Sequence, residues 1–417
     1  MVWGTKTGVT DLVQKLQAQN TKSMYILSTR KLTSSDAISL ATALKTHPVM
    51  EEFYISGHAL GADGLEAFAD VLAHNTVLRK LAVGTESLGD AGLAILCAGL
   101  ARNPRSAIAE LDMELKSIGD HGAGALGAML KMNSSIRHLV VARNQITAAG
   151  FEQLVAGLAA SNHVTEFDVA ENKLSLTSSL AQWLRQPNCS LATLNLAGNA
   201  LGDSAVAFFD ALGANASLRS LNLSDTHLSE TAVAALGRAL AQNQTLTTLD
   251  LSQNVLDDVT ALAGGLAANH GLVRLVLAKT RLGDAGAQLL RLPTTLQHLD
   301  LSANGLSAVG MLPHVAAPVK ELRVFDNALG AGLPEILPAL VANPVLEGLD
   351  VGANGLHGPL AITLFEALHT PTALKTLEVG GNDLGDAGLA ALDVLQACNP
   401  QLDVAIDKRG DSAVDDA

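Results

Sequence analysis

Apolar and polar residues recur along the chain in one fixed frame. The segment 191–203 reads LATLNLAGNALGD, with leucines at the first, fourth, sixth and eleventh positions and an asparagine at the ninth. The same frame returns at 246–256, 296–306 and 374–384, and weaker copies fill the gaps. Its last apolar position can be followed through Leu32, Leu60, Leu88, Ile118, Ile146, Leu174, Leu201, Leu228, Leu256, Leu282, Leu306, Leu329, Leu356 and Leu384, in steps of about 27 residues. The chain is therefore one repeated unit rather than a series of unrelated domains.

Each unit predicts a short strand, a turn and a helix. The LxxLxL segment has the period of a strand whose leucines point into the core. An asparagine follows where the chain turns, and its amide can pair with backbone groups of neighbouring turns. This position is held by Asn144, Asn172, Asn199, Asn254, Asn304, Asn327, Asn354 and Asn382, with Thr226 and Thr280 as partial substitutes. The next stretch, GLxxLxxxL, has helical spacing, and we expect Asp90, Asp120, Asp203, Asp284 and Asp386 to cap these helices.

Stacked units of this kind predict an α/β solenoid of about 14 repeats, each of 23–30 residues, over residues 22–406. Helices are wider than strands, so we expect a curved horseshoe with a parallel β-sheet on the concave side and helices on the convex side. Residues 1–21 predict an N-terminal capping helix, and residues 407–417 a polar C-terminal tail. Prolines in 283–340 predict shortened helices there, which leaves tolerated shortening and a partner-shaped notch as alternatives.

The unit length, the helical convex side and the phrase LGDAGxxxLAxxL resemble leucine-rich repeats of the ribonuclease-inhibitor type. This resemblance implies a protein partner, because proteins of this type bind ribonucleases, activate Ran GTPase, cap actin filaments, sense ligands in innate-immune receptors, scaffold axonemal complexes or act as secreted bacterial effectors. The chain is poorer in cysteine and aromatic residues than the ribonuclease inhibitors. It also lacks the inserted Arg-bearing loop and long acidic tail of the Ran GTPase activators, and Arg30 is its nearest candidate for an exposed arginine.

Composition narrows the classes of partner. The formal net charge of −14 argues against non-specific binding of nucleic acid or anionic membranes. Aromatic residues make up only 3% of the chain, which leaves little for base stacking, and no uncharged apolar run is long enough to insert into a membrane. The three cysteines, Cys97, Cys189 and Cys398, form no CxxC pair, so the sequence favours a reducing, cytoplasmic location, with cytoskeletal or ciliary association as a further candidate.

No catalytic constellation stands out. The segment 122–127 matches GxGxxG, but glycines at the same offset in other repeats explain its first glycine. No nucleophile–base arrangement or spaced set of metal ligands is present, so we expect no enzyme, no cofactor and no metal.

The outward positions of the predicted strands carry more acidic than basic residues. Such a surface attracts a basic protein partner; keeping an exposed sheet soluble and holding a cation are the alternatives. We expect the binding residues to be Glu110, Asp112, Glu114, Glu166, Asp168, Glu171, Asp225, Asp250, Asp300, Asp326, Asp350 and Glu378, together with Arg323 and Phe325 as an Arg–aromatic anchor.

The first predicted strands expose a different surface. There the frame turns Met24, Ile26 and Tyr54 outward, as an interface anchor or as a surface covered by the N-terminal segment that contains Trp3.

The sequence therefore predicts a non-enzymatic interaction scaffold or regulatory subunit of a larger assembly, with a cytoskeletal or axonemal complex as a candidate. The alternatives are a regulator of a small GTPase, similar to the Ran GTPase activators, and a bacterial effector-type repeat protein.

Overall fold

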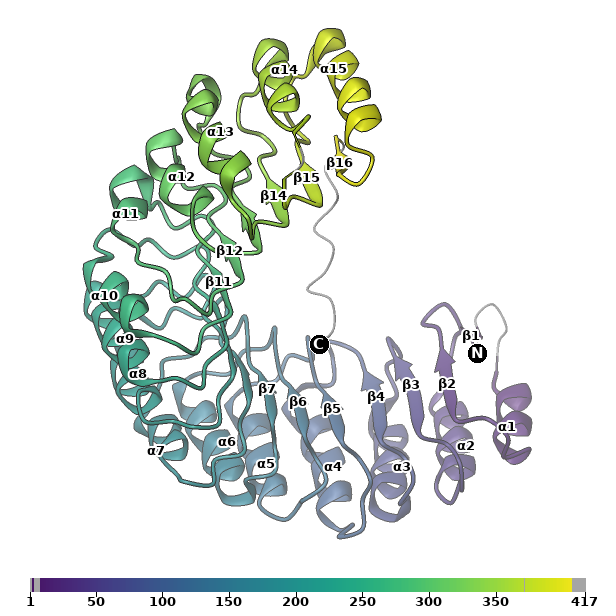
Figure 1. Cartoon of the computed structure of the whole chain (residues 1–417). Helices are drawn as coiled ribbons and strands as arrows, with labels where there is room; N and C mark the ends of the chain where they lie inside the picture. The colour runs from purple at the N-terminus through teal and green to yellow at the C-terminus, as the bar shows by residue number, and fades with distance from the viewer. Residues whose placement is uncertain (1, 4–7, 371, 407–417) are drawn as a thin grey trace. The chain divides into compact units, whose positions relative to one another are not determined.

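The computed structural model describes residues 2–3, 8–370 and 372–406, which fall into two compact units, Met1–Leu218 and Arg219–Ala417. Both units repeat one strand, one turn and one helix. Within each unit the strands pair in parallel with their sequence neighbours, and the helices cover one face of the sheet (Figure 1). The predicted α/β leucine-rich repeat fold is confirmed, and strands β2 to β15 each carry one copy of the predicted frame.

The first unit contains strands β1 to β8 and helices α1 to α8. In chain order they are β1 Val2–Trp3, α1 Thr10–Gln17, β2 Ser23–Ile26, α2 Ser34–Leu44, β3 Glu52–Ser56, α3 Gly61–His74, β4 Lys80–Gly84, α4 Gly89–Ala101, β5 Glu110–Asp112, α5 Asp120–Leu130, β6 His138–Val140, α6 Ala148–Ser161, β7 Glu166–Asp168, α7 Ser178–Leu184, β8 Thr193–Asn195, the 3-10 helix η1 Gly202–Ala205 and α8 Val206–Leu212.

The second unit continues the same alternation. Its elements are β9 Ser220–Asn222, α9 Glu230–Gln242, β10 Thr248–Asp250, α10 Thr260–Ala268, β11 Arg274–Val276, α11 Gly283–Leu289, β12 His298–Asp300, α12 Ala308–Val315, β13 Glu321–Arg323, the 3-10 helix η2 Gly330–Gly332, α13 Leu333–Ala342, β14 Gly348–Asp350, α14 Gly358–Ala367, β15 Thr376–Glu378, α15 Gly385–Cys398 and β16 Asp403–Ala405.

The core lies between sheet and helices, where the predicted inward leucines meet the apolar face of each helix. Leu194, Leu196 and Leu249 have no exposed surface, and the same holds for Trp183 in α7. Full burial of a leucine side chain is worth about 1.5–3 kcal/mol. The inward leucines of the repeated frame therefore contribute to the stability of every repeat.

The turn asparagines form a hydrogen-bonded ladder, which begins at Asn144 in the first unit and includes Thr226 and Thr280 in the second. The side chain of Asn254 donates to Leu223 O at 2.7 Å and Leu251 O at 2.9 Å, and its Oδ1 accepts from Leu228 N at 3.3 Å. Asn199 and Asn304 bond in the same way. Each amide thus joins its own turn to the preceding one, as predicted. The threonine substitutes are also buried, and each donates to the carbonyl three residues before it.

The expected aspartate N-caps are wrong. Helix α4 begins at Gly89, which has φ +60°, so Asp90 lies inside its first turn and Leu88 occupies the cap position. Gly283 places Asp284 in the same way, and Gly119 precedes Asp120. Leu201 and Leu384 hold the cap positions expected for Asp203 and Asp386.

Three of these aspartates instead accept hydrogen bonds from the start of the helix in the next repeat. Asp284 accepts from Ser307 N at 2.8 Å, Ser307 Oγ at 2.5 Å and Gly310 N at 3.1 Å, all at the start of α12. Asp90 and Asp120 reach the starts of α5 and α6. A carboxylate at a helix N-terminus is favoured by the free backbone N–H groups and the helix dipole.

The proline-rich stretch carries the predicted short helices. Helix α11 has 7 residues and α12 has 8, whereas α3 has 14. Pro313 lies inside α12 and Pro338 inside α13.

The two ends are only partly as predicted. Helix α1 lies within residues 1–21, where a helix was expected, but β1, which pairs with β2, was not predicted, and β16, which pairs with β15, adds a strand after the last copy of the frame. The expected tail, 407–417, lies outside the described residues. The GxGxxG glycines serve helix packing, because a Cβ at Gly127 would lie 2.4 Å from the carbonyl oxygen of Gln153 in α6.

Candidate functional site

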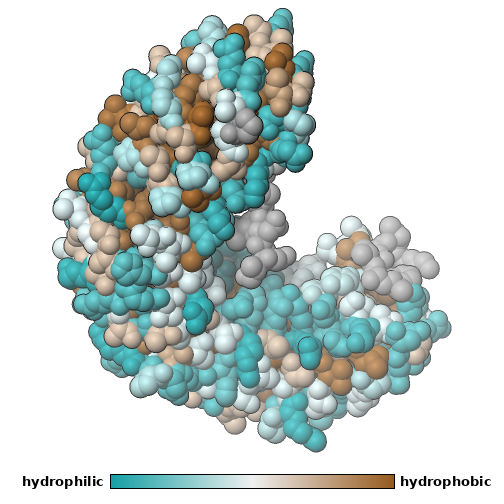
Figure 2. Space-filling view, viewed as in Figure 1, coloured by the Kyte–Doolittle hydropathy of each residue, from teal (hydrophilic) through white to brown (hydrophobic). Residues whose placement is uncertain are grey.

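The surface of interest is the open sheet face, by which we mean the face of each unit's sheet that carries no helices. All the predicted binding residues from Glu110 to Glu378 are exposed or half-buried there or on the adjoining turns. Hydrophilic side chains predominate over the strands of the first unit in the space-filling view (Figure 2). The predicted outward orientation of these residues therefore holds.

Five of these acids make the same hydrogen bond to the backbone. In each, Oδ1 accepts a hydrogen bond of 2.8–3.0 Å from the backbone N–H two residues later, which closes the turn after the strand. They are Asp112, Asp168, Asp250, Asp300 and Asp350. Asn195 and Asn222 occupy the same column and make the same bond at 3.1 and 2.9 Å. Val140 and Val276 hold the same column without any side-chain acceptor, so the turn does not require a negative charge at this position.

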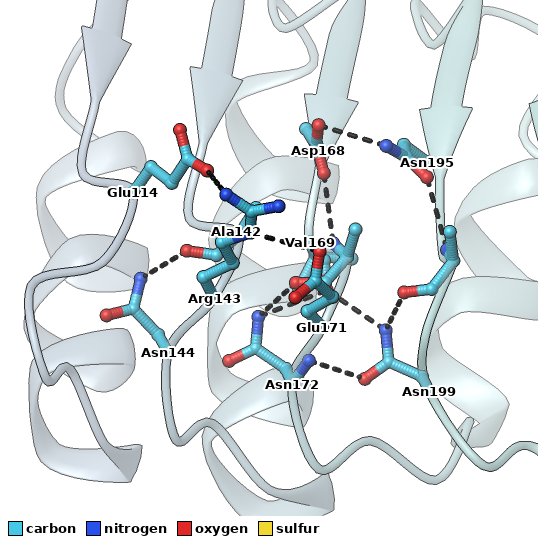
Figure 3. Close-up of polar contacts among 12 residues, drawn as sticks. Glu114, Ala142, Arg143, Asn144, Asp168, Val169, Glu171, Asn172, Asn195 and Asn199 are labelled. Atoms are coloured by element: carbon cyan, nitrogen blue, oxygen red, sulfur yellow. Dashed lines mark hydrogen bonds and ion pairs between the residues drawn. The ribbon is translucent and has the colours of Figure 1, made fainter. Parts of the chain in front are cut away.

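In the first unit, several acids are partly compensated by neighbouring side chains. Arg143 lies between Glu114 and Glu171, with Nη1 at 3.3 Å from one carboxylate and Nε at 3.0 Å from the other (Figure 3). Asp168 Oδ2 accepts from Asn195 Nδ2 at 3.0 Å. The acidic field of this unit is therefore weaker than the sequence suggests.

Pairing extends to three more predicted residues. Glu110 forms an ion pair with Lys80, Glu166 lies 3.8 Å from His138, and Asp225 lies 3.5 Å from His227. The histidine pairs are ionic only when the ring is protonated.

The second unit has a different electrostatic arrangement. Strand register places Asp300, Arg323, Asp350 and Glu378 side by side on strands β12 to β15. Within residues 8–370 and 372–406, none of these three acids has an ion-pair partner within 4.0 Å. Burial, and then the charge of Glu378, raise the pKa of Asp350 to about 6. The negative charge on this side chain is thus poorly compensated.

A hollow of about 260 Å³ opens beside these residues. Asp300, Arg323, Asp350 and Glu378 line it together with Phe325. Asp326 lines it as well. The structure therefore brings the predicted Arg–aromatic pair and four predicted acids together in one place.

At the N-terminal strands, the predicted exposure of Met24 and Ile26 is wrong, because their exposed fractions are 1% and 4%. One additional residue separates this strand from the turn position held by Arg30, which shifts the strand's register by one. Tyr25 points outward instead and stacks on Tyr54, with ring centroids 4.1 Å apart.

The tyrosine pair is tied to neighbouring charged residues. Both hydroxyls donate to Glu52 Oε2, at 3.3 and 3.2 Å, and Lys80 Nζ lies 5.5 Å from the Tyr54 ring centroid. Tyr54 is placed as expected, whereas Tyr25 was missed.

Arg30 is not an exposed arginine. It is 1% exposed, its Nη2 lies 2.5 Å from Asp11 Oδ1, and its Nε donates to Gly8 O at 2.7 Å. The residue anchors helix α1 to the first turn, which removes the predicted candidate for an arginine that acts on a GTPase.

Other features of the described residues concern metals, thiols and membranes. They contain no group of three or more His, Cys, Asp or Glu placed to hold a metal ion. Cys97 and Cys189 are buried and Cys398 is exposed, and burial raises the pKa of the Cys97 thiol to about 12. None of the helices described has the length and apolar character needed to cross a membrane.

Comparisons with known proteins agree with the fold. The leucine-rich repeat family matches residues 188–209, 214–237, 242–263, 293–313 and 371–392. The ribonuclease inhibitor of Sus scrofa is 27% identical over 384 residues, covering 87% of this chain and 83% of that protein. The ribonuclease inhibitor of Mus musculus is also 27% identical, covering 71% of this chain and 69% of that protein.

Two further similarities concern larger proteins. The NACHT, LRR and PYD domains-containing protein 12 of Homo sapiens is 28% identical over 84% of this chain, but this similarity spans only 37% of that protein. The structure of a TLR13–ssRNA13 complex matches the fold with a TM-score of 0.52 at 15% identity, covering 89% of this chain and 57% of that one. The repeated frame, the parallel sheet with its asparagine ladder and these relatives therefore agree on a leucine-rich repeat protein that is similar to the ribonuclease inhibitors.

Proposed function

We propose that this chain is a non-enzymatic interaction scaffold or regulatory subunit whose acidic open sheet face binds a basic protein partner. The relatives support the general class, because leucine-rich repeat proteins serve protein–protein interaction. We further propose an intracellular, cytoplasmic role within a larger assembly.

The observation that carries this proposal is the excess of charge over what the fold requires. The turn column functions equally well with asparagine at Asn195 and Asn222, yet it holds aspartate at five other places. Aspartate has no structural advantage over asparagine at such a turn, because both offer the same acceptor oxygen. The retained charges are available to steer and hold a cationic surface, which electrostatic complementarity favours.

The test compares two charge variants of the tagged chain expressed in its own cells. The face variant carries D112N, D168N, D250N and D300N, so every turn keeps its acceptor. The control carries D63N, D257N, D383N and D393N, at exposed positions on helices and loops outside the open sheet face. Both variants change the net charge by the same amount.

Partners are captured at low and at high salt, and their retention is compared with that of the unmodified chain. We expect the face variant to lose a basic partner and most of the salt dependence, while the control retains both. Equal retention by the two variants would contradict the proposal. Unchanged thermal unfolding of both variants ensures that the comparison reports on binding rather than folding.

A further inference from the structure

The hollow in the second unit has walls of different chemistry. Its lining includes small residues on successive turns, Ser252, Ala278 and Ser302, and the next repeat places Phe325 at the equivalent position. The ring extends over Gly352, since a Cβ there would lie only 2.8 Å from Phe325 Cδ2. A large ring beside small neighbours thus creates a recess with one apolar wall.

The lining also carries charges. Asp300, Asp350 and Glu378 contribute to it, and Arg323 lies between the first two in the strand register. Asp326 and Lys279 add one charge of each sign. Carboxylates therefore outnumber cations around the recess, and the three acids of the strand row have no described ion-pair partner within 4.0 Å.

We propose that this recess binds a single cationic side chain, preferably arginine, from the partner protein. The proposal rests on the function proposed above and gives its partner a chemical requirement. The guanidinium would lie among the carboxylates of Asp300, Asp350 and Glu378, where its planar donors allow charge-assisted bonds. Its aliphatic stem would lie along Ala278 and Phe325, as such stems do on apolar surfaces.

Size and electrostatics support this occupant. Pockets for drug-sized ligands begin at about 300 Å³, so a recess of about 260 Å³ suits one long side chain. Burial, and to a smaller extent the charge of Glu378, raise the pKa of Asp350 although Arg323 lies nearby, so an incoming guanidinium would further compensate this carboxylate.

The experiment uses the full chain and a blocked Ala-Arg-Ala peptide as the probe, measured by isothermal titration at low ionic strength. The matched peptide carries citrulline, which has the shape of arginine without its charge. We expect the arginine peptide to bind at least tenfold more tightly than the citrulline peptide. D350N, which keeps the turn bond, should weaken binding about tenfold, and A278L should weaken it as strongly by narrowing the recess without changing any charge.

Further outcomes separate this inference from the proposed function. If D250N and D350N weaken binding of the arginine peptide equally and A278L does not weaken it, the peptide is attracted by the acidic face in general. That result would overturn the inference that it binds in the recess. Conversely, specific peptide binding by a chain whose face variant still retains its partner would uphold the recess and contradict the proposed function. No difference between the two peptides would also overturn the inference.

The sequence contains a basic pair, Lys408 and Arg409, as an alternative source of a cation, and the experiment tests it separately. A variant that ends at residue 406 controls for it. If this deletion tightens binding of the arginine peptide more than fivefold, residues of the same chain occupy the recess. That result would overturn the proposal that a partner's side chain binds there. Unchanged affinity would support the partner.

Discussion

Replacing Asp350 by asparagine should stabilise the second unit at neutral and alkaline pH. The amide side chain of D350N would keep the bond from Gly352 N, because Asn195 makes the equivalent bond in its own turn. The substitution would also remove a charge that burial and Glu378 disfavour. An amide can bond to a neighbouring carboxylate as well, since Asn195 Nδ2 donates to Asp168 at 3.0 Å.

The magnitude follows from the raised pKa. A shift from 3.8 to about 6 is roughly two units, which corresponds to about 3 kcal/mol at about 1.4 kcal/mol per unit. Asp350 is partly exposed, so solvent screening reduces the expected gain to about 1–2 kcal/mol. For a raised carboxyl pKa, the favourable contribution is complete below the unfolded value of 3.8 and is lost as pH rises through about 6.

The assay is denaturant unfolding of D350N and the unmodified chain at pH 8, 6 and 4. We expect D350N to be more stable at pH 8, with the difference shrinking at pH 6 and vanishing near pH 4. Comparing the two proteins at each pH cancels the titration of other groups. D250N is the matched control, because the register neighbours of Asp250 are the uncharged Asn222 and Val276, and it should change stability less. A gain that is equal at pH 8 and pH 4 would refute the electrostatic explanation.

Three further changes test the packing of the repeats. Asn254→Ala should destabilise the second unit by about 3 kcal/mol or more in denaturant unfolding, because it leaves several buried backbone groups unpaired. As the control, Thr226→Asn restores the usual residue of the ladder and should lower the free energy of unfolding much less. Asp284→Ala removes three hydrogen bonds to the start of α12 and should lower the free energy of unfolding by about 2–3 kcal/mol. Hydrogen exchange at Ser307 and the residues after it should become faster, and unchanged exchange there would contradict this role of Asp284. Burial lowers the pKa of His314 to about 4, so its stabilising contribution is present above pH 6.5 and lost as pH falls toward 4. H314Q should therefore reduce acid sensitivity by about 3 kcal/mol between pH 7 and pH 4, and an unchanged pH profile would argue against this origin.

Much of the fold could be predicted because hydrophobic spacing and the turn asparagine report the same geometry in every repeat. The strand β2 is the exception. Met24, Tyr25, Ile26 and Leu27 are all apolar or aromatic, so hydrophobicity cannot show which of them face inward. Counting back from the turn residue Arg30 gives the wrong register, because Arg30 comes one residue later than usual, and only the pairing of Met24 with Phe53 in the next strand fixes it.

The candidate site could be predicted as a surface but not as a set of interactions. The outward acids follow from strand alternation, whereas Arg143 could have paired with any of several carboxylates within reach of its long side chain. The sequence does hold one signal of these interactions: Asn195 and Asn222 stand between Asp168 and Asp250 in one column, which indicates a shared hydrogen bond. The recess depends on the three-dimensional position of one ring, Phe325, so the repeat pattern of the sequence does not predict it.

The asparagine ladder separates two kinds of variation in this molecule. Helices vary from 7 to 14 residues on one side, as α11 and α3 show, but adjacent strands remain about 4.8 Å apart whatever their repeat length. Within each unit, the distance between outward side chains on adjacent strands therefore does not depend on the length of the repeat. Insertions and deletions on the helix side can accumulate without changing the spacing of charges that a partner would meet.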